Sequence, residues 1–318
     1  MDVFDSSISF NERALYLFNL QATNCLVYNK YLKLLRINPL KIDDWKKIPF
    51  LPIQFFKSHK VLCSNETIDT IFSSSATSGN TSSKHYVSDI NIYEKSFFSC
   101  FNHFYGKASD YRILALLPSY LERGGSSLVY MCEKLISTSK NNQSGFYLNN
   151  FEDLKKILKQ ETKKKTLLIG VSYALLDLIE KENLPLKNTI VMETGGMKGR
   201  RKEMIKKDLH LKLKTGFQQE NVHSEYGMTE LLSQAYSNGN GIFTSPDWMK
   251  VIARSTDDPF TIIGNDVTGG LNIVDLANIN SCAFIATQDL GKVMSNHQFE
   301  VLGRFDNSDI RGCNLMVQ

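Results

Sequence analysis

Before about residue 240, short continuous apolar runs alternate with helical stretches along this 318-residue chain. The runs are YRILALLPS at 111–119, TLLIGVSY at 166–173 and NTIVMETGG at 188–196. The helical stretches lie near 89–105, from Ser126 to about Ser137, near 151–160, and from the second run to about Asn183. Strands that are buried on both faces and joined by helical crossovers form parallel sheets. The pattern therefore predicts an α/β fold whose ligands bind at the carboxyl ends of the strands.

The two ends of the chain differ from this central pattern. Residues 11–36 place apolar side chains at helical spacing, which predicts one amphipathic helix that ends before Pro39. After about residue 240, β-rich segments such as GGLNIVDL and FEVLGRF are separated by Gly, Asn and Asp. We therefore expect an α/β region over 1–245 and a smaller β-rich subdomain over 246–318.

Composition excludes several classes of protein. The chain has no apolar run of the roughly eighteen residues that a membrane span needs, and its acidic N-terminus does not resemble a secretory signal, so we expect a cytoplasmic protein without a membrane span. Its six cysteines form no C-x-x-C pair, so most are expected to be buried thiols. The net charge of +4 comes largely from lysine-rich segments at 154–165 and 198–214. These segments lack interleaved aromatic residues, which favours solvated helix faces and argues against nucleic-acid binding.

The stretch SSSATSGNTSSKH at 73–85 contains only small residues before its lysine and histidine. Successive Ser, Thr and Gly residues in a turn direct backbone N–H groups and hydroxyls into one concavity, which suits the phosphates of a nucleotide. The Walker pattern does not fit, because Gly79 stands five residues before Lys84 and no glycine precedes that lysine. Taken alone, the stretch is better explained as a serine-rich surface loop, and only partner segments elsewhere in the chain favour the phosphate-binding interpretation.

Three further segments give this stretch a context: HSEYGMTE at 223–230, TQDLG at 287–291 and GRFDNSDIRG at 303–312. In this order, the four segments resemble the core motifs of the acyl-adenylate-forming superfamily, which includes phenylacetate-CoA ligases. With LPSYLERGGSSLVYM at 117–131, the closer resemblance is to the LuxE-like acyl-protein synthetases, and it runs from about Pro49 to Gln318. The resemblance implies mostly parallel sheets flanked by helices, followed by a β-rich subdomain that completes an ATP site. It also implies ATP-dependent activation of a carboxylic acid, expected to be fatty, and acyl transfer to a thiol.

The resemblance also assigns roles residue by residue. Tyr226 matches the aromatic residue that packs on adenine, Thr229 the hydroxyl near the α-phosphate, and Glu230 the carboxylate that holds Mg²⁺. Asp289 and Arg304 match the pair at the ribose, and Lys84 matches a catalytic cation at the end of the phosphate loop. The remaining ATP-binding positions are Ser74, Ser75, Thr77, Ser78, Gly79, Gly195 and Gly196. Ala76 departs from the family's usual glycine.

The chain stops six residues after Gly312, so the family's mobile C-terminal domain and its catalytic lysine are expected to be absent. Lys84 and Arg311 are candidates to replace that lysine. The resemblance implies that an enzyme cysteine near the C-terminus carries the acyl group to a reductase partner or another protein acceptor. Cys313 is the candidate nucleophile, although an inert buried thiol explains it as well. Candidate acyl-binding residues are Tyr120, Ser126 and Ser127.

Other interpretations stay open at this stage. The acceptor thiol is either a protein cysteine or coenzyme A, and a third alternative is a nucleotide-binding interaction subunit without catalysis. The segment TGGMKGR lacks the G-x-G pair of a dinucleotide-binding turn. If EYGMTE stood alone, a core aromatic and a helix-start acid would be the favoured explanations of Tyr226 and Glu230; the other motifs favour the ligand roles. His85 and His223 receive no role.

Overall fold

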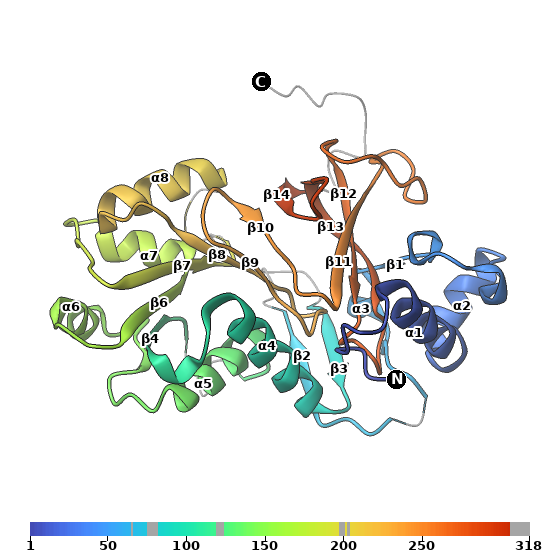
Figure 1. The fold of residues 1–318 in the computed structure, drawn as a ribbon, viewed down its shortest axis with the longest axis horizontal. Coiled ribbons are helices and arrows are strands. Elements are labelled where there is room, and N and C mark those ends of the chain that lie inside the picture. The colour runs from blue at the N-terminus through green and yellow to red at the C-terminus, as the bar shows by residue number, and fades with distance from the viewer. Residues whose placement is uncertain (65, 75–81, 119–123, 197–200, 202–203, 306–318) are drawn as a thin grey trace.

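A computed structural model describes residues 1–64, 66–74, 82–118, 124–196, 201 and 204–305 of the chain (Figure 1). Its α-helices are α1 (Phe10–Asn24), α2 (Leu26–Leu34), α3 (Phe55–Ser58), α4 (Ile90–Tyr105), α5 (Ser127–Ser139), α6 (Phe151–Lys159), α7 (Ser172–Ile179) and α8 (Lys206–Phe217). Short 3₁₀ turns lie at η1 (Pro39–Lys41), η2 (Trp45–Lys47) and η3 (Ala108–Asp110).

The first large sheet has the strand order β5-β4-β6-β7-β8-β9. Its strands are β4 (Tyr111–Leu116), β5 (Gly145–Phe146), β6 (Lys165–Val171), β7 (Thr189–Thr194), β8 (His223–Tyr226) and β9 (Ala235–Ser237). All pairings are parallel except that of β9 with β8. This order confirms the predicted α/β fold with a mostly parallel sheet.

Burial explains why the strands of this sheet appear as continuous apolar runs. Every residue of β4 is buried, as is every residue of β6 after Lys165 and every residue of β7 after Thr189. Figure 1 shows α7 and α8 on one side of the sheet and α4 and α5 on the other. Because both faces are covered by helices, neither face needs polar residues along these strands.

The second large sheet has the order β10-β14-β13-β12-β11, and β1 also pairs with β13. Its strands are β1 (Leu51–Pro52), β10 (Ile242–Phe243), β11 (Met249–Arg254), β12 (Gly269–Asp275), β13 (Phe284–Val293) and β14 (Phe299–Arg304). The pairing of β1 with β13 is parallel and the others are antiparallel. The sheet thus takes β1 and β10 from before residue 246, and the division into 1–245 and 246–318 stays a prediction.

The N-terminal segment forms two helices, where the sequence pattern predicted one over 11–36. Cys25 has an extended backbone between α1 and α2, and its backbone forms an isolated antiparallel β-bridge with that of Cys63. The Ser9–Glu12 capping box begins α1. Gln21 of α1 donates to the carbonyl of Asn278 over 2.7 Å and accepts from the Ala283 N–H over 2.9 Å. The break at Cys25 arises because the chain pairs there with a distant segment, which helical spacing does not reveal.

A two-stranded antiparallel hairpin, β2 (Thr70–Ser73) and β3 (Lys84–Val87), carries the serine-rich stretch between its strands. Figure 1 shows this hairpin between α4 and the second large sheet. Among the described residues, no helix combines the length and the apolar character that crossing a membrane requires.

Candidate functional site

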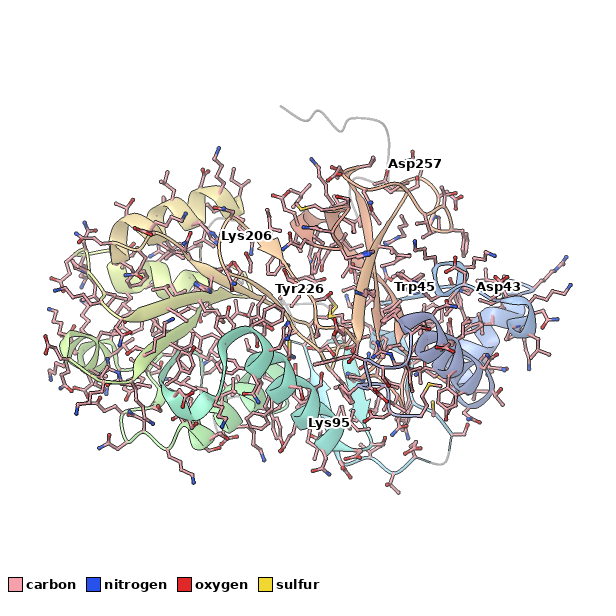
Figure 2. The ribbon with its side chains drawn as sticks, in the orientation of Figure 1. Asp43, Trp45, Lys95, Lys206, Tyr226 and Asp257 are labelled. Atoms are coloured by element: carbon pink, nitrogen blue, oxygen red, sulfur yellow. The ribbon has the colours of Figure 1, made fainter. Side chains whose placement is uncertain are left out.

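The two large sheets meet at Tyr226, the last residue of β8 (Figure 2). The Tyr226 hydroxyl donates to Asp289 Oδ2 over 2.7 Å, and Arg304 Nε donates to Asp289 Oδ1 over 3.0 Å. Asp289 and Arg304 face one another across β13 and β14. Asp289 is buried, while the Arg304 side chain is 71% exposed. The structure therefore brings together three residues that lie far apart in the sequence, and it leaves the guanidinium open to a ligand.

An aromatic cluster surrounds one part of the Tyr226 ring. The ring centres of Phe243 and Phe299 lie 5.7 and 5.4 Å from that of Tyr226, and 5.4 Å from each other. Both phenylalanines are buried, whereas Tyr226 is partly exposed. Packing on two buried rings fixes the orientation of Tyr226 and leaves part of its ring accessible.

The turn after Tyr226 carries Thr229 and Glu230. The Glu230 side chain is buried beside Ser83, at the end of the serine-rich stretch. Burial raises the pKa of Glu230, and a hydrogen bond with Ser83 opposes that rise. The nearby Arg304 guanidinium also favours the charged carboxylate. Glu230 is thus a buried carboxylate next to the serine-rich stretch and within electrostatic reach of Asp289 and Arg304.

The serine-rich stretch is closed at its base by hydrogen bonds between Ser74 and Ser83. The Ser83 N–H donates to Ser74 Oγ over 2.9 Å, and the Ser74 N–H donates to the Ser83 carbonyl over 3.0 Å. Lys84 follows as an exposed residue that pairs with Ser73 across the hairpin. The predicted loop residues Ser75, Thr77, Ser78 and Gly79 lie outside the described residues.

Gly195 and Gly196 follow the carboxyl end of β7, and both are exposed. Gly195 has a φ of +62°, a backbone conformation that glycine adopts without strain. The Ser172 hydroxyl lies 3.1 Å from the Gly195 carbonyl and 3.3 Å from Glu193 Oε2. These contacts hold the start of the turn against α7.

Glu193 and its neighbours form a buried polar network that the sequence analysis missed. Lys206 Nζ donates to Glu193 Oε1 over 2.6 Å, and His210 Nε2 lies 3.3 Å from the same oxygen. Burial alone would raise the pKa of Glu193, but the Lys206 ammonium and the hydrogen bonds lower it to about 2. Lys206 Nζ also lies 4.9 Å from the centre of the Phe243 ring. The network therefore connects β7 to the aromatic cluster around Tyr226 (Figure 2).

Glu225 was also missed, although it precedes Tyr226 directly. It is buried, and its carboxylate accepts a hydrogen bond from the Thr194 hydroxyl. Burial raises the pKa of Glu225 to about 7, despite this hydrogen bond. In the sequence, Glu193 is a charged residue near the end of an apolar run and Glu225 lies within the HSEYGMTE segment. Neither signal reveals the partners.

The contacts of the remaining predicted residues that the structure describes do not indicate a role in ligand binding. Ser126 caps α5 by accepting from the Val129 N–H, and the Ser127 carbonyl accepts from the Tyr93 hydroxyl. Tyr120 and Cys313 lie outside the described residues. The other five cysteines are buried free thiols, as expected.

No group of three or more His, Cys, Asp or Glu side chains is arranged to hold a metal ion within the described part of the chain. Glu230 is a single carboxylate, and magnesium commonly uses one or two carboxylates together with substrate phosphates. Cavities of about 740 and 380 Å³ lie elsewhere, between α7 and α8 and beside residues 259–262. Of the predicted site residues that the structure describes, none lines either cavity.

Comparison with known proteins identifies the fold. No family model and no curated protein matches the chain. Among solved structures, 2-hydroxyisobutyryl-CoA ligase in complex with 2-HIB-AMP and CoA has a TM-score of 0.65 at 10% identity, over 94% of this chain and 69% of that one. ATP-bound MatB from Rhodopseudomonas palustris has a TM-score of 0.57 at 15% identity, over 74% of this chain. The chain spans about half, 48%, of the MatB chain. These likenesses confirm the predicted α/β fold, which the chain shares with both solved structures over most of its length.

Proposed function

We propose that this chain binds ATP and magnesium and activates a carboxylic acid as an acyl-adenylate, which then transfers its acyl group to a thiol. The observation that carries the proposal is the convergence of Tyr226, Asp289 and Arg304 beside the buried Glu230 carboxylate. Two solved structures with this fold are described with ATP or with an acyl-AMP bound.

The proposed role of each residue follows from its surroundings. Tyr226 presents a partly exposed ring for the adenine, next to the Gly195–Gly196 turn at the end of the neighbouring strand. Asp289 accepts from the ribose hydroxyls, and the exposed Arg304 guanidinium donates to an oxygen of the nucleotide. The loop that Ser74 and Ser83 close encloses the phosphates, with Lys84 at its end.

The donor set fits magnesium together with a nucleotide. Glu230 supplies one carboxylate beside the loop, and the phosphates of ATP supply further oxygen ligands. Magnesium, when bound, neutralises negative charge on the phosphates. The residues of the chain do the remaining work by positioning the acid and ATP and by excluding water.

The proposed reaction has two steps, adenylation of the acid and transfer of the acyl group. A carboxylate oxygen of the acid attacks the α-phosphorus of ATP, the bond to the bridging oxygen breaks, and pyrophosphate leaves. A thiol sulfur then attacks the acyl carbonyl, and AMP leaves with the bonding electrons as the thiol proton is lost. We propose a fatty or other organic acid as substrate, with Tyr120, Ser126 and Ser127 as candidate acyl-binding residues.

A protein cysteine is the proposed acceptor, with Cys313 as the candidate and a reductase or another protein as the later recipient. Coenzyme A is the second candidate, favoured by a solved structure of the same fold that is described as a CoA ligase bound to CoA. Acyl label that stays on the denatured protein, is released by neutral hydroxylamine and disappears in Cys313→Ser supports the first acceptor. Formation of acyl-CoA by the wild type and by Cys313→Ser alike supports the second.

The first half-reaction is tested by exchange of labelled pyrophosphate into ATP over a panel of acids of graded length. We expect acid-dependent exchange, and its loss in Glu230→Gln with an unchanged circular dichroism spectrum. Glu220→Gln is the matched control, because Glu220 is exposed beyond the end of α8. If no acid in the panel supports exchange, the proposed activation of an acid is refuted. The chain would then be a nucleotide-binding subunit without catalysis, or a protein that does not act on nucleotides.

A further inference from the structure

His85 is a buried histidine of β3 for which the sequence suggested no role. Its side chain contacts three separate segments of the chain. Nδ1 lies 2.9 Å from the Thr229 carbonyl, and Nε2 lies 3.0 Å from Ser281 Oγ. The His85 and Phe56 rings pack edge to face, with their centres 5.6 Å apart and an interplanar angle of 88°. Both ring nitrogens therefore have partners, and the ring plane is fixed.

The partners determine the tautomer of His85. Burial lowers the pKa of His85 to about 4, so the ring is neutral at physiological pH. A carbonyl oxygen can only accept, so Nδ1 carries the proton and donates it to Thr229. Nε2 then accepts from the Ser281 hydroxyl. The Thr229 carbonyl thereby selects the tautomer, and the Ser281 hydroxyl satisfies the second ring nitrogen.

The Thr229 carbonyl belongs to the turn that presents Glu230. The Glu230 carbonyl accepts from Asn278 Nδ2 over 2.9 Å, and its carboxylate contacts Ser83. Ser83 lies two residues before His85 and also closes the base of the serine-rich stretch. Ser83 and His85 thus join the end of that stretch to the Thr229–Glu230 turn at two points.

We propose that His85 is a positioning residue, whose Nδ1–H bond to Thr229 sets the separation between Ser83, at the base of the serine-rich stretch, and the Glu230 carboxylate. The inference rests on the proposed function, because a magnesium ion held by Glu230 and the phosphates that it binds must lie beside that base. His85 itself contacts no reacting atom in this scheme. It acts through the backbone of Thr229, so its loss affects the nucleotide and leaves the acid largely unaffected.

The test compares His85→Leu, His85→Asn and Ser281→Ala with the wild type. We expect His85→Leu to weaken equilibrium binding of MgATP, measured calorimetrically, by about tenfold, the factor that 1.4 kcal/mol represents. The KM for ATP in pyrophosphate exchange rises equally, and the KM for the acid stays constant. His85→Asn recovers most of the affinity, because its amide N–H can donate to the Thr229 carbonyl. If His85→Leu does not fold, Ser281→Ala, which leaves the buried Nε2 without its hydrogen-bond partner and so loosens the His85 ring, provides a smaller effect in the same direction.

His103→Asn is the matched control, because His103 is exposed on α4. Folded His85 and Ser281 variants with wild-type MgATP affinity would overturn the inference while leaving the proposed function intact. Equal increases in both KM values, without rescue by asparagine, would show a general structural defect and would also overturn it. A wild-type chain that neither binds MgATP nor exchanges pyrophosphate would instead refute the proposed function, and the inference with it.

Discussion

Replacing Glu225 by glutamine should make the protein more stable at alkaline pH. The Glu225 carboxyl is buried, and its pKa is raised from 4.5 to about 7 by the loss of solvation. Each tenfold change in proton affinity corresponds to about 1.4 kcal/mol, so ionising this carboxyl in the folded protein costs about 3 kcal/mol. Glutamine has nearly the same shape and carries no charge, and its amide oxygen can still accept from Thr194.

The sign of the pH dependence follows from proton binding. Between pH 4.5 and about 7, the folded protein holds a proton on Glu225 that the unfolded chain has lost. The contribution of Glu225 to the free energy of unfolding therefore falls as the pH rises through this window. Below the window, the wild type and Glu225→Gln should be nearly equal in stability, and above it the variant should be more stable.

Urea unfolding of both proteins, from about pH 5 to about pH 8.5, measures this difference. The advantage of Glu225→Gln should grow by about 2.5 kcal/mol across that range. Glu133→Gln is the control, because Glu133 is exposed on α5 and its loss should produce no comparable trend. A constant difference between Glu225→Gln and the wild type at all pH values would refute the reasoning.

Two further substitutions test the network and the site. Lys206→Met leaves Glu193 buried without its cation, so the free energy of unfolding at neutral pH should fall by about 3 kcal/mol. Because the pKa of Glu193 is lowered from 4.5 to about 2, the ionised carboxylate stabilises the fold above pH 4.5, and this stabilisation is lost as the pH falls toward 2. Lys206→Met removes the cation that favours the ionised carboxylate, so acid unfolding of this variant should begin at higher pH. Lys206→Arg should retain most of the stability. If the free energy of unfolding of Lys206→Met equals that of the wild type, the ion pair does not stabilise the fold. Tyr226→Phe keeps the ring packing but loses the bond to Asp289, so the KM for ATP should rise about fivefold. A loss of stability without a change in that KM would argue against a nucleotide role for this pair.

Much of the architecture was predictable because burial on two faces leaves a direct mark on the sequence. The apolar runs of β4, β6 and β7 indicated a parallel sheet, and its pairings confirm that prediction. The segments that resemble adenylate-forming enzymes also contained Tyr226, Asp289 and Arg304, which the structure brings together. Their roles toward ATP stay predictions.

The contacts among the site residues were not predictable from spacing. Glu193 meets Lys206 and His210 only because α8 returns along the sheet, and the pKa values of Glu193 and Glu225 move in opposite directions according to their neighbours. The two residues have the same side chain and lie near the ends of adjacent strands. Nothing in the linear sequence distinguishes a buried acid that is paired with a cation from one whose partner is a neutral hydroxyl.

The sequence by itself determined the α/β class, the positions of the buried strands along the chain and the identity of the residues at their ends. Tertiary structure alone decided that Cys25 interrupts the first helix, that β1 and β10 join the second sheet, and that His85 holds the turn before Glu230. The physical reason is that periodic burial is a local property that each segment records in its own residues. A hydrogen bond or an ion pair between distant segments depends on where the folded backbone brings two side chains together, and neither segment alone records that meeting.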